Sequence, residues 1–184
     1  MYIEQVEQSI LLSTLQNTIW AIRPEWIPTI HNIVLSHFFD KEHRAERIQK
    51  AEEMLGHKLD NSTNGDADIR KVKDTNILVI PIHGVIGKRM NMMTDISGGI
   101  STQKLQDEIT NGIDNPDIDA IVLDVESPGG VMDFTKETAD FIFNARDKKP
   151  IVSFANGEMA SAAYYIGSSA LKVFSYDSAL IGSI

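Results

Sequence analysis

The hydrophobic and polar positions follow different patterns in the two parts of the chain. Up to about residue 60, apolar residues such as Ile3, Val6 and Ile10 recur at three- and four-residue spacing, which is typical of amphipathic helices. Later in the chain, short runs of branched apolar residues alternate with helical spacing. We therefore predict a helical N-terminal extension over 1–60, a linker over 61–70 and an α/β domain over 71–184.

In the first part, the pattern predicts three helices and no strand. The first begins near the N-terminus, the second runs from about Pro28 to Phe39, and the third follows Asp40 and ends at Gly56. The segment 60–68, DNSTNGDAD, is polar and rich in turn-forming residues, so it is typical of a linker.

In the second part, strand and helix patterns alternate. This alternation predicts βαβ units with right-handed crossovers on a mainly parallel sheet. The expected strands are 76–85, 120–125, 150–154 and 173–176, and the expected helices are 102–112, 134–146 and 160–171.

Composition narrows the functional classes. The chain has 184 residues, a formal net charge of −9 and no cysteine, which excludes disulfides, thiolate metal sites and cysteine nucleophiles. The acidic balance argues against nucleic-acid binding, and no apolar run is long enough to cross a membrane. We predict no metal site and no cofactor, and we expect a soluble protein of the cytoplasm.

Two segments carry candidate chemistry. Ser127-Pro128-Gly129-Gly130 follows a predicted strand, where two glycines would bare backbone N–H groups as an oxyanion hole requires, although a plain turn has the same pattern. Ser161 stands at the start of a predicted helix, where free N–H groups stabilise negative charge, although it would also serve there as an ordinary helix cap. A strand-end Gly-Gly followed by a helix, a strand and this serine would bring both segments to one sheet edge.

Four segments resemble peptidase family S49, the signal-peptide-peptidase-A-like serine proteases of the Clp-protease/crotonase fold. They are HGVIG (83–87), DAIVLDVESPGG (119–130), ANGEMASAAYYI (155–166) and ALIGSI (179–184), in the family's order and spacing. Within the family, the chain looks most like the phage capsid-assembly (prohead) proteases. The resemblance implies that Ser161 is the nucleophile and that Gly129, Gly130 and the N–H of Ala162 form the oxyanion hole.

The general base is not identified within the chain. Four histidines lie in the helical part, and a packing or turn role is favoured for His83. The family uses a neutral lysine, which the resemblance places beyond Ile184, so we expect a domain truncated before its base and a chain that is inactive alone. Lys172 is separated from Ser161 by roughly 16 Å of predicted helix, while Lys88 and Lys104 match no family position.

The leading hypothesis is a serine endopeptidase that processes scaffold or capsid proteins in phage head assembly, in the host cytoplasm or the prohead. The resemblance implies a homo-oligomer at full length. Two alternatives stay open: a crotonase-like acyl-CoA enzyme, and an inactive assembly subunit. We also expect the exposed edge near 131–134 to receive an extended peptide by strand addition.

Overall fold

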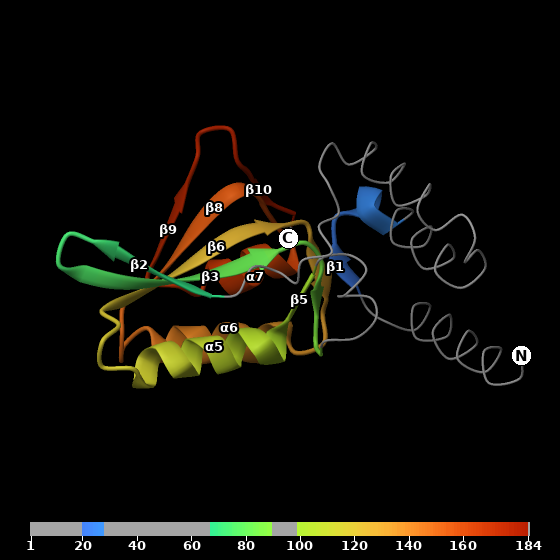
Figure 1. Ribbon diagram of the computed structural model, residues 1–184. Helices are drawn as coiled ribbons and strands as arrows, with labels where there is room; N and C mark the ends of the chain where they lie inside the picture. The colour runs from blue at the N-terminus through green and yellow to red at the C-terminus, as the bar shows by residue number, and fades with distance from the viewer. Residues whose placement is uncertain (1–19, 28–66, 90–98, 184) are drawn as a thin grey trace, which may run out of the picture.

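A computed structural model of the chain describes residues 20–27, 67–89 and 99–183 (Figure 1). The helices expected near the N-terminus, over 28–39 and over 40–56 lie outside the described residues. The expectation of no strand in the N-terminal part is wrong, because Trp20–Ile22 forms strand β1, which is followed by the 3₁₀ helix η1, Pro24–Trp26. Three residues are too few to show a strand pattern, and β1 exists because a distant strand pairs with it.

The larger sheet has six strands in the order β10-β8-β6-β3-β2, with β9 also paired to β8. All of its pairs are parallel except β2 with β3, which confirms the prediction of βαβ units on a mainly parallel sheet. Its strands are β2 (Asp68–Val72), β3 (Thr75–His83), β6 (Ala120–Ser127), β8 (Ile151–Ala160), β9 (Lys172–Ser175) and β10 (Leu180–Gly182).

A smaller sheet of four strands has the order β1-β7-β4-β5. Strands β4 (Ile86–Gly87), β5 (Ile100–Ser101) and β7 (Gly129–Val131) run parallel to one another, and β1 is antiparallel to β7. The sheet is closely packed at Gly130, where an added Cβ atom would lie 2.0 Å from the carbonyl oxygen of Ile86. Pairing of β7 with β4 therefore requires glycine at this position.

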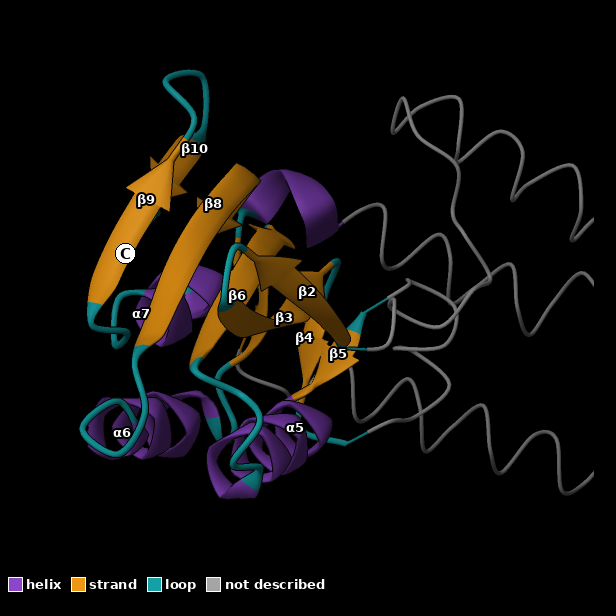
Figure 2. Ribbon diagram, turned by 60° about the vertical axis from the view of Figure 1, so that its left-hand side comes forward, coloured by secondary structure: helices purple, strands orange, loops and turns teal. Residues whose placement is uncertain are grey.

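Helices α5 (Thr102–Asp114) and α6 (Thr135–Ala145) lie side by side against one face of the larger sheet (Figures 1 and 2). The N-cap of helix α5 is Ser101, whose hydroxyl oxygen accepts a hydrogen bond of 3.0 Å from the N–H of Lys104. The short helix α7 (Ala162–Gly167) follows β8, and the buried hydroxyl of Ser153 donates a 2.8 Å hydrogen bond to the carbonyl oxygen of Gly167. These contacts hold the helices against the strands that carry the candidate site.

The core lies between the helices and the inward positions of the central strands. Along β6 every second side chain is buried, as the two-residue period of a strand requires. On β3, Leu78, Ile80 and Ile82 follow the same period, and Pro81 is buried as well. The largest fully buried side chains are Ile80, Ile82, Ile86, Ile100, Leu105, Ile109, Ile121, Leu123, Ile142, Ile151, Met159 and Ile166. Among the residues described here, no helix is long and apolar enough to cross a membrane.

The C-terminal elements differ in length from the sequence predictions. Strand β8 continues past residue 154 to Ala160, with Gly157 at φ +132°, because the sheet accommodates an Asn-Gly pair that is typical of a turn. Helix α7 is correspondingly shorter than the predicted 160–171, and Lys172 begins β9 rather than ending a helix. Strand β2 begins at Asp68, so the last residues of the predicted linker segment are strand.

We predict that Gly130→Ala destabilises the fold by about 3 kcal/mol or more, because the added methyl group would overlap the Ile86 backbone. Gly112→Ala is the matched control: its Cβ atom would lie 2.6 Å from Cδ2 of Leu78, the end of a side chain, and alanine gains about 1 kcal/mol of helix propensity. Urea unfolding of both variants measures the difference. Equal losses of stability would contradict this account of the β4–β7 contact.

Candidate active site

Ser161 is held in a strained backbone conformation between β8 and α7. Its φ of 53° and ψ of −118° are unusual for a residue with a side chain and cost about 1–3 kcal/mol. The N–H of Ser161 donates a 2.7 Å hydrogen bond to the carbonyl oxygen of Gly182, and its own carbonyl oxygen accepts one of 2.9 Å from the N–H of Tyr165. Its hydroxyl makes no capping hydrogen bond to α7, so the alternative of an ordinary helix cap is not supported.

Gly129 lies beside Ser161. Its φ of +107° suits only glycine, and a Cβ atom added there would lie 3.0 Å from Cβ of Ser161. The two segments that the sequence singled out therefore meet, as the order of strands predicted. Ala162 is the first residue of α7, so its N–H has no partner within the helix.

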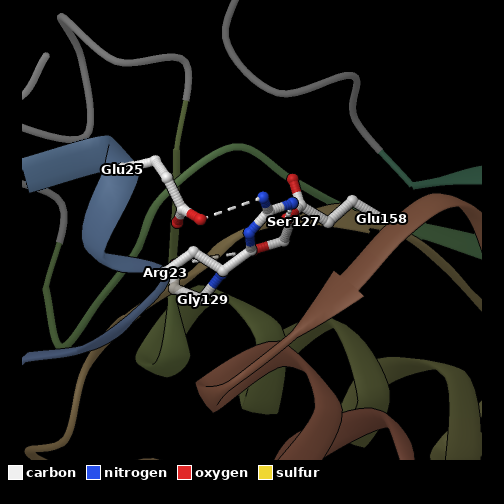
Figure 3. A network of polar contacts seen from close by, with 5 residues as sticks. All are labelled: Arg23, Glu25, Ser127, Gly129 and Glu158. Carbon is white, nitrogen blue, oxygen red and sulfur yellow. Dashed lines mark hydrogen bonds and ion pairs between the residues drawn. The ribbon is translucent and has the colours of Figure 1, made fainter. Parts of the chain in front are cut away.

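Ser127 fixes the backbone that leads into Gly129. Its buried hydroxyl donates a 2.6 Å hydrogen bond to the carbonyl oxygen of Gly84 and accepts one of 3.2 Å from the N–H of Gly129 (Figure 3). A substrate carbonyl that uses this N–H would have to replace the longer of the two bonds. The sequence reading missed this role, although a serine directly before Pro-Gly-Gly is a local signal for it.

Arg23 joins the N-terminal segment to the site. Its N–H donates to the carbonyl oxygen of Pro128 at 3.2 Å, and its guanidinium lies between Glu158, at 2.8 Å, and Glu25, at 3.4 Å (Figure 3). The hydrogen bond to Glu158 raises the pKa of Arg23, and hydrogen bonds from its own backbone and from Arg23 lower the pKa of Glu25. The sequence reading missed Arg23 and Glu158, which are separated by 135 positions.

His83, the last residue of β3, contacts an aspartate. Its Nε2 atom lies 3.4 Å from Oδ2 of Asp124. Because β6 lies between β3 and β8, the end of β3 that carries His83 is about 10 Å from β8. The geometry therefore gives no support to a triad with Ser161.

The three lysines considered from the sequence are engaged elsewhere or distant. Lys88 lies 3.0 Å from Asp133 and 4.4 Å from the ring centre of Phe134. Lys104 lies 3.5 Å from Glu108 on its own helix. Lys172 is paired opposite Val152, so most of the length of β8, roughly 25 Å, separates it from Ser161.

No metal site emerges from the described part of the chain. Within 20–27, 67–89 and 99–183, no three histidine or acidic side chains gather closely enough to hold a metal ion.

The chain is similar to phage capsid-assembly proteins. It is 28% identical over 127 residues to capsid assembly protease C of Escherichia phage lambda, which covers 68% of this chain and 29% of that protein. It is 27% identical over 108 residues to head-tail preconnector protein GP5 of Enterobacteria phage P21, which covers 59% of this chain and 22% of that protein. These relatives confirm the predicted resemblance to phage capsid-assembly proteases, and the chain spans less than a third of the length of either.

Solved structures with a similar fold include enoyl-CoA hydratases. The enzyme from Mycobacterium avium subsp. paratuberculosis K-10 is 13% identical with a TM-score of 0.43, and the match covers 62% of this chain and 46% of that one. The enzyme from Rhodobacter sphaeroides 2.4.1 is 17% identical with a TM-score of 0.35, covering 62% and 38%. No family model matches the chain.

We predict that Ser161→Gly is more stable than Ser161→Ala by about 1 kcal/mol. Both changes remove the hydroxyl, but only glycine relieves the strain at φ 53°, and this relief exceeds the entropy that glycine adds to the unfolded chain. Urea unfolding curves of the two variants measure the difference. If the Ser161→Ala variant is at least as stable as the Ser161→Gly variant, the backbone at Ser161 is not strained.

Proposed function

We propose that this chain carries the nucleophile and oxyanion hole of a serine endopeptidase. The observation that carries the proposal is the strained Ser161 at the end of β8, with Gly129 directly beside it. Such strain is common at catalytic residues, where it fixes a side chain in a reactive position. If Ser161 had only a structural role, glycine would fit this turn with less strain. The presence of serine therefore favours a role for its hydroxyl group.

In the proposed reaction, the Ser161 hydroxyl attacks the carbonyl carbon of a peptide bond and gives its proton to a general base. The negative charge that develops on the carbonyl oxygen is stabilised by the N–H groups of Gly129 and Ala162, and Gly130 allows the approach of β4 that fixes this turn. The base returns the proton to the leaving amine, and water then releases the acyl group from the serine. By the family resemblance, we expect the base to be a lysine beyond Ile184.

We infer that the substrates are capsid or scaffold proteins of a phage head. This inference comes from the similarity to two relatives, one a capsid assembly protease and the other a head-tail preconnector protein. The expectation of an exposed edge near 131–134 is wrong for Val131, because β7 is paired with β1 on one side and with β4 on the other. An extended polypeptide could add a strand to β7, next to Ser161, only in the place that β1 occupies. A homo-oligomer and a place in the host cytoplasm or the prohead remain part of the proposal.

The test is cleavage of the scaffold and capsid proteins of the same phage, with the chain expressed together with any coding sequence that follows Ile184. We predict that Ser161→Ala lowers kcat/KM by about 10⁴-fold or more, because no other group replaces the nucleophile. Ser168→Ala, which alters an exposed serine just after α7, is the matched control and should retain full activity.

A fluorophosphonate probe gives a second readout, since it should label the protein at Ser161 and not label the alanine variant. Cleavage that survives Ser161→Ala would exclude Ser161 as the nucleophile. Turnover of an acyl-CoA substrate that survives Ser161→Ala, with no cleavage of the phage proteins, would instead favour the acyl-CoA enzyme class. Head assembly that needs the protein but not Ser161 would instead select the inactive assembly subunit.

A further inference from the structure

The edge of β7 is already occupied by a segment of this chain. β1 pairs antiparallel with β7, so that Ala21 is opposite Gly130 and Ile22 is opposite Gly129. A Cβ atom added to Gly129 would lie 2.3 Å from the carbonyl oxygen of Ala21 and 3.0 Å from Cβ of Ser161. The Ala21 carbonyl group and the candidate nucleophile therefore meet at the same glycine.

An ion pair between Arg23 and Glu158 holds the chain just after β1 against β8. The Arg23 guanidinium donates a 2.8 Å hydrogen bond to the carboxylate of Glu158, which is on β8 three positions before Ser161 (Figure 3). Only 17% of the Glu158 side chain and 30% of the Arg23 side chain are exposed, so the pair is partly shielded from water. A charge-assisted hydrogen bond of this kind discriminates strongly against a neutral or acidic residue in place of arginine.

We propose that the β7 edge and Glu158 form a binding cleft for an extended peptide that pairs with β7 and has a basic residue two positions after the one opposite Gly130, and that residues 20–23 occupy this cleft as an internal ligand. The interpretation of the cleft as a substrate site rests on the proposed peptidase function. The basic residue is required by Glu158.

The direction of β1 assigns the two sides of the cleft. The carbonyl group of Ala21 lies next to Ser161, so the bond between Ala21 and Ile22 is the one presented to the nucleophile, and Arg23 falls on the side of the leaving amine. Because the internal segment is tethered, its effective concentration at the cleft is of the order of millimolar, and it competes with any free peptide. Substrate binding therefore requires that residues 20–23 withdraw.

The test measures binding rather than cleavage, with the full chain carrying Ser161→Ala. The probe is a fluorescein-labelled peptide of residues 18–26, TIWAIRPEW, and the readout is fluorescence anisotropy. Adding Arg23→Glu should raise its affinity roughly tenfold, because the internal segment is then repelled by Glu158. In that chain, Glu158→Gln should lower the affinity roughly tenfold, whereas Glu137→Gln, on the exposed side of α6, should leave it unchanged.

A crosslink provides a measurement that does not depend on Glu158. The chain has no cysteine, so Trp20→Cys with Val131→Cys creates a single pair, at positions directly opposite each other in the β1–β7 ladder. We predict that this pair oxidises readily to a disulfide, that the disulfide blocks peptide binding and that reduction restores it. Trp20→Cys with Phe143→Cys, an exposed position on α6, is the control that should not crosslink within the chain.

The proposal is overturned if the peptide binds the crosslinked chain as tightly as the reduced chain. It is also overturned if neither Arg23→Glu nor Glu158→Gln changes the affinity for the peptide. Either result would leave the peptidase proposal intact, since that depends on Ser161. Conversely, if the binding effects are observed but Ser161→Ala does not abolish cleavage, the peptidase proposal is rejected and the peptide-binding cleft is not.

Discussion

Gly129 and Gly130 carry no side chains, and other stretches of backbone fill the space that side chains there would need. The carbonyl oxygen of Ala21 and Cβ of Ser161 crowd the first glycine, and the backbone of Ile86 crowds the second. Strands β1, β4 and β7 and the start of α7 therefore depend on one another at this point. A methyl group added at either glycine would overlap backbone atoms of a neighbouring strand, so these elements would have to shift.

The strain at Ser161 is maintained by its surroundings. Its N–H is held by Gly182 of β10 and its carbonyl group by Tyr165 of α7, while β8 is paired on both sides up to its last residues. A conformation that costs about 1–3 kcal/mol persists because relaxing it would break several of these contacts together. The serine is thus positioned by the sheet rather than by its local sequence.

The sequence predicted the elements whose signals are local and missed those that depend on distant pairing. Continuous branched residues indicated β3 and β6, and helical spacing indicated α5 and α6, because each of these elements buries a long apolar face. β1 has three residues and is held by β7, more than one hundred positions away, so no local pattern reveals it. The approach of Ser161 to Gly129 was predictable from the strand order, whereas the contact of Arg23 with Glu158 was not.

Glu158 favours occupation of the cleft by a basic residue. Withdrawal of the N-terminal segment would break the charge-assisted hydrogen bond from Arg23 and leave the Glu158 carboxylate to be hydrated by water. A basic residue from another polypeptide restores that bond, and an apolar or acidic residue does not. The same carboxylate that holds the internal segment in place would therefore also select the segment that displaces it, so occupancy and specificity of the cleft depend on one side chain.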